Sequence, residues 1–337
     1  MPVYRRLYDY YRHAIVTQQF PPGSRIDSIN ELQERHKVSR ETAKRVLAML
    51  AADKLIIQQA GRGSFVSHLG PRKPVWGVIV PFFSSQIESL VAHLAEEAEA
   101  AKQAIELCVG HNNWEEEIRL VGKMINERYE AVIVIPTLDE TKTAEFYRRL
   151  ASGGTVVTLL DHTMAGSYFT YVIQSYDLGV KRAVEYLLQG TRLSLAFVGR
   201  HPSVGRNMIQ ELMEESFRGF VESAGRTAFI INRVADVSQP FLTRNRIGGF
   251  FCCDDIDAIR VAGRLKESGI NLGSDVKLVS YGNTDLAIYF TPPITSIDGH
   301  LDIMAARTAA IIKQHLKGQH AGTLQFVIQP DLVVRDT

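Results

Sequence analysis

Residues 28–50 read SINELQERHKVSRETAKRVLAML and contain two short helical patterns with a tight turn between them. Ser28 and Ser39 each place the hydroxyl of a helix N-cap at the start of one pattern. From 40 to 52, apolar residues recur every three or four positions, which predicts an amphipathic helix. The stretch therefore predicts a helix-turn-helix, whose second helix (the recognition helix) would lie in the major groove of DNA.

The flanking residues extend this unit to a small domain. Residues 4–19 have apolar side chains at helical spacing, and Pro21-Pro22-Gly23 ends that first helix. The segment 55–66 reads as a β-hairpin with Gly61-Arg62-Gly63 at its tip. Three helices followed by a hairpin predict a winged helix-turn-helix domain over 1–68.

The charges are divided unevenly along the chain. Residues 1–74 hold 13 Lys and Arg against 6 Asp and Glu, a balance of +7, whereas the rest of the chain holds 25 against 31. A basic small domain joined to a mildly acidic large one predicts that the first domain binds a polyanion. Charged residues on a solvated helix face would also account for part of this balance. The charge alone therefore does not identify the polyanion, and the sequence motifs are needed to do so.

Several side chains of the predicted domain suit contact with DNA. Arg40, in the first turn of the recognition helix, can form two hydrogen bonds to one guanine, and hydroxyls such as that of Ser39 can bond to phosphate oxygens. An arginine between two glycines at the hairpin tip suits a minor-groove or phosphate contact. The DNA-binding residues predicted from these patterns are Ser39, Arg40, Thr42, Lys44, Arg45, Gly61 and Arg62.

The N-terminal domain resembles the GntR-type winged helix. The shared motifs are Pro22-Gly23, Val38-Ser39-Arg40-Glu41-Thr42 and Gly61-Arg62-Gly63-Ser64-Phe65-Val66. The resemblance implies sequence-specific binding to an operator. The family usually has an arginine at the position of Asn30, so the resemblance implies a DNA contact at Asn30 and an operator that differs from the family's usual one.

After a linker at 69–74, short apolar runs alternate with helical patterns. The runs predicted as strands are 75–80, 105–109, 131–135, 155–160, 195–198, 229–231, 248–252 and 276–280. The predicted helices are 84–102, 113–127, 141–151, 178–188, 208–223, 256–268 and 301–315. Continuous apolar strands that alternate with helices predict an α/β fold with parallel sheets covered on both faces.

Polar residues gather where the predicted strands end. Open α/β sheets bind ligands at the carboxyl ends of their strands, so this edge is the predicted binding site. The residues placed there are Ser84, Ser85, His111, Asn112, Asp139, Asp161, His162, Arg200, His201, Asp254, Asp255 and Asn283.

Residues 75–335 resemble the effector domain of LacI-type repressors and the periplasmic ribose-binding proteins. The matching stretches are Leu159-Leu160-Asp161-His162, Asp177-Leu178-Gly179, Cys253-Asp254-Asp255-Ile256-Asp257-Ala258 and Pro292-Pro293-Ile294-Thr295-Ser296-Ile297. The resemblance implies a periplasmic-binding-protein fold in which two lobes close on a sugar. Within 75–337, lobe one would comprise about 75–171 and 299–322, and lobe two about 172–298 and 323–337.

The same resemblance implies roles for single residues. Asp161 matches a lobe-one aspartate that takes two sugar hydroxyls, and Asp254 matches a sugar-binding Asn or Asp of lobe two. For Asp177 and Asp255 we prefer a structural role as helix caps. The predicted effector-binding residues are Phe83, Ser84, Ser85, His111, Asp161, His162, Arg206, Asp254 and Asn283.

Two positions depart from the LacI-type pattern. Ser216 stands where that family has an arginine, and Gly282 where it has an aspartate. Either Arg206 supplies the missing cation, or the ligand lacks the hydroxyls that those residues serve. Phe82 or Phe83 can stack on the apolar face of a sugar, although a core role is equally open for each.

A GntR-type head on a LacI-type body resembles the arabinose-repressor architecture. It implies a repressor of carbohydrate metabolism that senses a pentose or deoxyhexose such as arabinose or fucose. The alternatives are a regulator that senses a non-sugar metabolite and, with less support, a sugar-modifying enzyme. The sequence has no P-loop, no Gly-x-Ser-x-Gly elbow and no His/Cys metal spacing, so we expect no catalysis, cofactor or metal.

The sequence also bears on location and assembly. No apolar run reaches the roughly 18 residues that span a bilayer, and 1–19 lacks a signal-peptide core, so we expect a cytoplasmic protein with no membrane partner. Cys108, Cys252 and Cys253 have no metal or disulfide spacing and are expected to be buried reduced thiols. We expect a homodimer, because such domains usually read paired half-sites.

Overall fold

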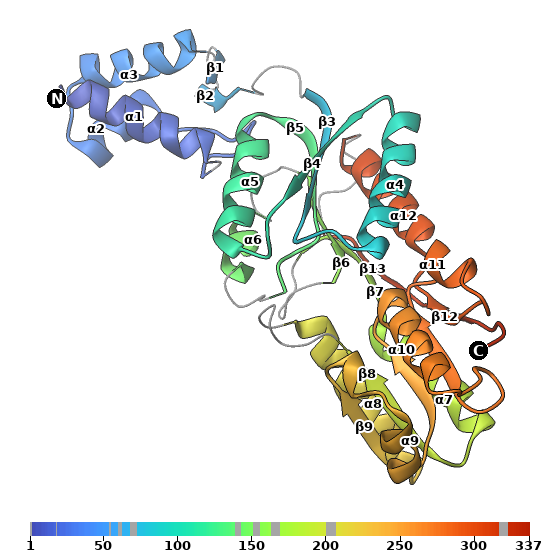
Figure 1. Ribbon diagram of the computed structural model, residues 1–337. Helices are drawn as coiled ribbons and strands as arrows, with labels where there is room; N and C mark the ends of the chain where they lie inside the picture. The colour runs from blue at the N-terminus through green and yellow to red at the C-terminus, as the bar shows by residue number, and fades with distance from the viewer. Residues whose placement is uncertain are drawn as a thin grey trace.

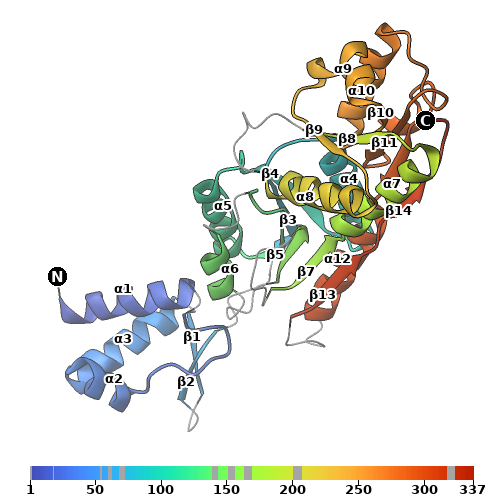
Figure 2. The ribbon, with the colours of Figure 1, turned by 90° about the horizontal axis from the view of Figure 1, so that it is seen from below.

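The computed structural model describes residues 2–17, 19–53, 55–59, 63–67, 73–138, 143–150, 156–162, 169–199, 207–316 and 323–337. The chain forms three bodies: an N-terminal domain and two lobes, each lobe built on a six-stranded sheet. Figures 1 and 2 place the N-terminal domain beyond lobe one, at the end of the molecule away from lobe two. In the described ranges, no helix combines the length and the apolar character needed to cross a bilayer.

The N-terminal domain consists of three helices and an antiparallel pair of strands. These elements are α1 (Val3–Val16), α2 (Ile29–His36), α3 (Arg40–Ala52), β1 (Ile56–Gln59) and β2 (Gly63–Val66). Ser28 caps α2 in a capping box with Glu31, and Lys37, at a φ of 50°, forms the left-handed turn that leads to α3. The predicted helix-turn-helix is therefore confirmed, while the hairpin tip with Gly61 and Arg62 lies outside the described residues.

A separate core holds the three helices and the hairpin together. Leu32, Val46 and Leu50 are fully buried in it. Because α3 buries this apolar face, its opposite face, with Arg40 and Lys44, is exposed to solvent. The amphipathic pattern of the sequence thus decides which side chains of α3 can meet a partner.

Lobe one is a parallel sheet with helices on both faces, in the strand order β13-β7-β6-β5-β3-β4. Its strands are β3 (Lys73–Val80), β4 (Ala104–Val109), β5 (Tyr129–Val134), β6 (Val157–Asp161), β7 (Tyr171–Gln174) and β13 (Gln325–Ile328). One face is covered by α4 (Ser85–Ala100) and α12 (Leu301–Leu316), and the other by α5 (Trp114–Asn126) and α6 (Ala144–Leu150). The predicted α/β class with parallel sheets is confirmed.

Lobe two repeats this plan in the order β14-β12-β11-β10-β8-β9, with only its edge strand β14 antiparallel. Its strands are β8 (Ser194–Val198), β9 (Ala228–Ile231), β10 (Ile247–Cys252), β11 (Lys277–Tyr281), β12 (Thr295–Asp298) and β14 (Asp331–Val333). One face carries α7 (Tyr176–Gly190) and α8 (Met208–Ser223). The other carries a 3-10 helix (Val234–Asp236), α9 (Gln239–Asn245), α10 (Asp255–Glu267) and α11 (Asp285–Ile288).

The chain passes between the lobes three times, after β7, after β12 and between β13 and β14. The third crossing lies at 329–330 and not near 323 as expected, because β13 pairs with β7 in lobe one. The expected set of strands lacked β7, β12, β13 and β14. Each of these has only three or four residues and includes a polar one, so none forms a continuous apolar run such as the one that predicted the equally short β9.

Candidate functional site

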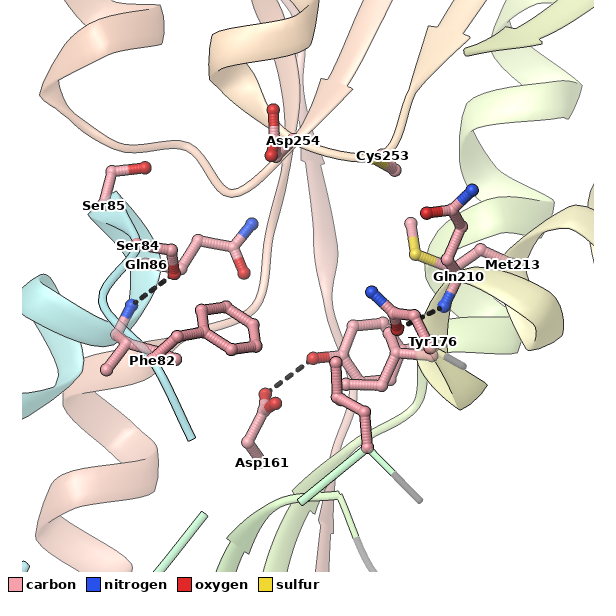
Figure 3. Close-up of a pocket in the computed structure, with 14 residues that line it drawn as sticks. Phe82, Ser84, Ser85, Gln86, Asp161, Tyr176, Gln210, Met213, Cys253 and Asp254 are labelled. Carbon is pink, nitrogen blue, oxygen red and sulfur yellow. Dashed lines mark hydrogen bonds between the residues drawn. The ribbon is translucent and has the colours of Figure 1, made fainter. Parts of the chain in front are cut away.

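A cavity of about 100 Å³ lies between the two lobes, at the carboxyl ends of both sheets (Figure 3). Lobe one lines it with the turn from β3 into α4 and with the end of β6, and lobe two with the start of α8 and the turn from β10 into α10. The lining residues are Phe82, Ser84, Ser85, Gln86, Ile87, Leu138, Asp161, Tyr176, Asn207, Ile209, Gln210, Met213, Cys253 and Asp254. Parallel sheets collect ligand-binding residues at this edge.

Asp161 is held in place by residues of the first crossing. It ends β6 at a φ of 72°, and its side chain is 14% exposed. Its Oδ1 accepts hydrogen bonds from Tyr176 OH at 2.6 Å and from Gln174 Nε2 at 2.7 Å. Burial, and then the charge of Asp161, raises the pKa of Tyr176 well above its usual value, so the phenol keeps its proton and donates. The carboxylate is therefore oriented by the fold itself.

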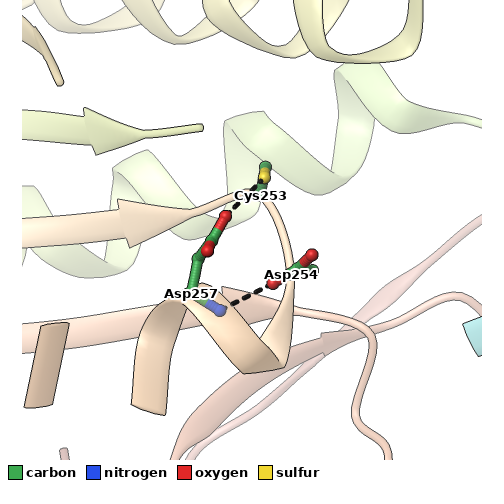
Figure 4. A group of neighbouring side chains, drawn as sticks. All are labelled: Cys253, Asp254 and Asp257. Carbon is green, nitrogen blue, oxygen red and sulfur yellow. Dashed lines mark hydrogen bonds between the residues drawn. The ribbon is translucent and has the colours of Figure 1, made fainter. Parts of the chain in front are cut away.

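Asp254 lines the cavity from lobe two and also caps α10. Its Oδ1 accepts a hydrogen bond from the amide of Asp257 at 2.7 Å. Cys253 lies beside this turn, and its thiol donates to Asp257 Oδ2 at 3.5 Å (Figure 4). The candidate ligand atoms of these three residues lie within 4.8 Å of one another, but Asp257 also accepts from Arg260 at 3.2 Å. Capping and pairing thus explain the cluster without a metal ion.

Asp255 has a structural role that differs from the expected helix cap. Asp254 occupies the N-cap position, which leaves Asp255 inside the first turn, where it is 1% exposed. There it accepts hydrogen bonds from the hydroxyls of Ser280 and Ser296 and from the amide of Thr284. These bonds tie the start of α10 to β11 and β12, so Asp255 supports the wall of the cavity from behind.

Ser216, the position at which the LacI-type pattern has an arginine, is not among the residues that line the cavity. Its hydroxyl donates to Asp177 Oδ1 at 2.7 Å and so joins α8 to α7. Asp177 is therefore an acceptor between two helices, and the expectation of a cap was wrong because Ser175 holds the N-cap position of α7. What α8 contributes to the cavity is Ile209, Gln210 and Met213.

The predicted effector-binding residues that line the cavity are Ser84, Ser85, Asp161 and Asp254. Phe83 does not, because its side chain is 62% exposed and Phe82 faces the cavity instead (Figure 3). His111 is exposed in the turn before α5, at a φ of 54°. Arg206 lies outside the described residues.

His162 and Asn283 belong to the scaffold around the cavity. His162 is 5% exposed, and its Nδ1 lies 3.4 Å from Asp161 Oδ2. Asn283 donates through Nδ2 to Asp298 Oδ2 at 3.0 Å and accepts from the guanidinium of Arg335. Both residues follow a strand, but neither lines the cavity: His162 lies behind Asp161, and the side chain of Asn283 is engaged by Asp298 and Arg335.

Sequence reasoning missed most of the remaining lining residues. They are Gln86, Ile87, Leu138, Tyr176, Asn207, Ile209, Gln210, Met213 and Cys253. Gln86 directly follows the predicted pair Ser84 and Ser85, and Asn207 is the N-cap of α8, so extending the strand-end rule into the next helical turn would find both. Tyr176 has no such signal, because its place depends on where the chain crosses between lobes.

The exposed face of α3 is the candidate nucleic-acid interface. Lys44 Nζ lies 3.6 Å from a carboxylate oxygen of Glu41, and the guanidinium of Arg45 lies 3.8 Å from the ring centroid of Tyr4. Arg40 is exposed in the first turn and has no ion-pair partner among the residues that the structure describes. Of these cations, Arg40 is therefore best placed to bond to a base.

The polar residues around the start of α3 are partly engaged in the fold. Ser39 caps the helix by accepting from the amide of Thr42 at 3.2 Å, and the two hydroxyl oxygens lie 2.9 Å apart. Asn30 is exposed in the first turn of α2. Gly61 and Arg62, at the predicted hairpin tip, lie outside the described ranges.

Two protein families match separate parts of the chain. Residues 3–66 match the gntR family of bacterial regulatory proteins, and residues 184–337 match the periplasmic binding protein-like domain. The chain joins a gntR-type domain to a periplasmic binding protein-like domain. The gntR-type domain makes it a DNA-binding transcription regulator.

The chain is similar to proteins named as transcription regulators or repressors. The HTH-type transcriptional repressor PurR of Vibrio vulnificus is 20% identical over 269 residues, which are 76% of this chain and 77% of that one. The crystal structure of a periplasmic binding protein/LacI transcriptional regulator from Alkaliphilus metalliredigens, complexed with D-xylulofuranose, is 15% identical with a TM-score of 0.66, covering 79% of this chain and 99% of that chain. A dimeric lac repressor with an 11-residue C-terminal deletion is 17% identical with a TM-score of 0.67, over 78% and 98% of the two chains. At these identities the likeness shows the fold of the periplasmic binding protein-like domain.

Proposed function

We propose that the chain is a sequence-specific regulator whose affinity for operator DNA is controlled by a small sugar bound between the two lobes. One observation carries this proposal: Asp161 of lobe one and Asp254 of lobe two line the same cavity (Figure 3). A ligand that bonds to both carboxylates stabilises the closed arrangement of the lobes over any open one, and it shifts the equilibrium by that difference in affinity.

The lining of the cavity suits a small polyol. Carboxylates accept charge-assisted hydrogen bonds from neighbouring hydroxyl groups, and Ser84, Ser85 and Gln210 add further polar side chains. Phe82 offers a ring against which the C–H face of a sugar can pack. We propose a pentose or a deoxyhexose, such as arabinose or fucose. The D-xylulofuranose complex of the similar regulator from Alkaliphilus metalliredigens supports a sugar of this size.

We also propose that the regulator acts as a homodimer. One helix-turn-helix domain covers one half-site, and dimers of such domains read two half-sites spaced by whole turns of the double helix. The similar lac repressor is dimeric, which supports the same assembly here.

Operator affinity measured with and without sugar tests the proposal. Selection from a random DNA pool by the purified protein supplies the operator, and a thermal-shift screen of monosaccharides supplies the ligand, because a ligand stabilises the state that binds it. Asp161→Asn and Asp254→Asn should each weaken sugar binding by about 2 kcal/mol or more, because a buried hydroxyl loses a charged partner. Operator affinity without sugar should stay near the wild-type value.

Asparagine is the sharper replacement at both positions. At 254 it keeps an acceptor that caps α10, whereas Asp254→Ala would remove the cap as well. At 161 it keeps an acceptor for Tyr176. If both variants keep the full sugar response, the cavity is not the effector site. If Asp161→Asn lowers thermal stability and operator affinity together while the sugar response survives, Asp161 serves only its own loop.

Two other functions predict different results. The apolar part of the lining, which includes Leu138, Ile209 and Met213, favours a non-sugar metabolite as the alternative effector. In a thermal-shift screen, such a regulator would be stabilised by a compound from a panel of non-sugar metabolites and by none of the sugars. A sugar-modifying enzyme would consume substrate at a rate proportional to the concentration of the protein. We expect no turnover of sugars or sugar phosphates, with or without nucleotides and divalent metals, and turnover that Asp254→Asn abolishes would contradict the proposal.

A further inference from the structure

One of the hydrogen bonds that join the two lobes at the cavity comes from a side chain of α4. Gln86 lies in the first turn of α4 in lobe one, and its side chain lines the cavity. Its Nε2 donates to the backbone carbonyl of Tyr281 at 2.8 Å, and Tyr281 is the last residue of β11 in lobe two. The bond therefore connects residues 195 positions apart in the sequence, and opening the lobes would break it.

The next residue, Gly282, is what lets Gln86 reach that carbonyl. Gly282 has a φ of +141°, a conformation that side chains with a Cβ rarely adopt. A Cβ at this position would lie 2.7 Å from Gln86 Nε2 and 2.9 Å from Asp255 Oδ2. Asp255 cannot move aside without losing its bonds to Ser280 and Thr284. The space that a side chain at 282 would fill is thus occupied by the carboxamide of Gln86.

The direction of this bond decides what Gln86 can offer to a ligand. Because Nε2 donates to the lobe-two carbonyl, Oε1 is left as the acceptor, and in Figure 3 it lies on the side of the carboxamide that faces the ring of Phe82 in the cavity. A carboxamide oxygen accepts from a hydroxyl or an N–H group. A donor on the ligand at that point would also polarise the amide and strengthen its bond to Tyr281.

We propose that Gln86 is an effector-binding residue that reads a hydroxyl or N–H group of the ligand through Oε1 while it holds the lobes together through Nε2. This rests on the proposed function for the identity of the ligand, but the contact between the lobes stands without it. Gln86 and the Tyr281 carbonyl meet only in the closed arrangement, so their hydrogen bond stabilises closure of the lobes. A bound ligand stabilises the closed arrangement further.

The thiols of the chain report on closure directly. Cys253 lines the cavity, whereas Cys108, on β4, is partly exposed and does not line it. Brief labelling of the full-length protein with N-ethylmaleimide in sugar-free buffer, followed by peptide mass spectrometry, gives the ratio of labelling at Cys253 to labelling at Cys108. Opening of the lobes raises this ratio, while any general loosening of lobe one would raise the labelling of Cys108 as well.

Gln86→Leu removes the bond to the Tyr281 carbonyl with little change in volume and should raise the labelling ratio at least threefold. Gln86→Glu should do the same, because a carboxylate has no hydrogen to donate to a carbonyl. Glu88→Gln is the matched control, since Glu88 is exposed in the first turn of the same helix and does not line the cavity, and it should leave the ratio unchanged. An unchanged ratio in Gln86→Leu would overturn the lobe contact.

The ligand arm uses L-arabinose, D-xylose, D-ribose and L-fucose as probes in calorimetric titrations. For any of these that binds the wild-type protein, Gln86→Leu should weaken binding at least tenfold, and equal binding by the two proteins would overturn the role of Oε1. If none binds the wild-type protein, the proposed sugar effector and this reading of Oε1 both fail, while the labelling ratio still decides the contact between the lobes.

Discussion

Asp161 connects the cavity to the points at which the chain passes between lobes. It accepts from Gln174 and Tyr176, which flank the first crossing, and Gln174 Oε1 accepts from the hydroxyl of Tyr281 in lobe two at 3.1 Å. A Cβ at Gly299, in the second crossing, would lie 2.0 Å from Gln174 Oε1, so a side chain there would displace the carboxamide of Gln174. A ligand bond to Asp161 therefore acts on the same side chains that hold the two lobes in register.

Arg40 is predicted to read a base. Arg40→Ala should cost about 1–3 kcal/mol of operator affinity and relax specificity at one base pair. Lys44→Ala should instead weaken operator and random DNA alike and reduce the salt dependence of binding. Fluorescence anisotropy on both DNAs over a salt series distinguishes these results, with Lys181→Ala on α7 as an exposed control. If Arg40→Ala weakens both DNAs equally, Arg40 does not read a base.

The buried Glu117 on α5 should make stability depend on pH. Its carboxylate accepts from Tyr147 OH and from the amide of Thr137, both at 2.6 Å, but burial outweighs these bonds and raises its pKa from 4.5 to about 7. Between these two values the folded chain keeps a proton that the unfolded chain has lost. The contribution of Glu117 to stability is therefore complete below pH 4.5 and declines as the pH rises toward 7.

Glu117→Gln should remove this pH dependence. Relative to the wild type, the free energy of unfolding of the variant should rise by up to about 1.4 kcal/mol per pH unit between pH 5 and 7. Urea unfolding at several pH values measures it. Glu115→Gln, at an exposed position of the same helix, controls for the loss of a surface charge. Parallel pH profiles for wild type and Glu117→Gln would contradict the assignment.

At the scale of single helices, the N-termini of α3 and α10 each combine a structural role with a proposed functional one. The N-cap of α3 is Ser39, beside the exposed Arg40, and the N-cap of α10 is Asp254, at the cavity. The first amides of a helix lack partners within it, and the helix dipole makes this end electropositive. One side chain at each start therefore stabilises its helix and lies where an anionic or polar partner would be placed.

Substitutions at Ser39 should separate the capping role from the DNA contact. Ser39→Ala should lower the stability of the N-terminal domain by about 1 kcal/mol, because the cap is lost. Ser39→Asp keeps a capping oxygen and should preserve stability, but its charge would repel phosphates and should reduce operator affinity more than tenfold. Thermal unfolding and operator titration measure the two effects. Wild-type operator affinity in Ser39→Asp would place the start of α3 away from the DNA.

At the scale of the whole molecule, the cavity lies between the lobes, whereas the recognition helix lies in the N-terminal domain beyond lobe one (Figure 2). The proposed coupling between the two sites would therefore pass through the arrangement of the lobes. Thermodynamic linkage requires that the sugar change operator affinity by the same factor as the operator changes sugar affinity. We expect both factors to be equal in calorimetric titrations of the free protein and of the protein saturated with operator. An operator affinity that saturating sugar leaves unchanged would contradict any coupling between the two sites.

The sequence by itself determined the helix-turn-helix, the alternation of strands and helices, and two acidic residues of the cavity. Ser28, Ser39 and the apolar period of α3 are local signals, readable within one or two helical turns. Asp161 and Asp254 were predicted because each follows an apolar run and matches the LacI-type pattern. Each lies at the carboxyl end of its own parallel sheet, in agreement with the rule for ligand sites in such sheets.

Only the tertiary structure decided which polar residues meet. Gln86 reaches Tyr281 across the lobes, and Phe82 rather than Phe83 faces the cavity. The tertiary structure also placed β13 in lobe one, because a four-residue strand is assigned by the partner with which it pairs and not by its own period. The physical reason is the same in each case. Capping and amphipathicity act between neighbours in the chain, whereas side-chain direction at a sheet edge depends on hydrogen bonds and packing between segments far apart in the sequence.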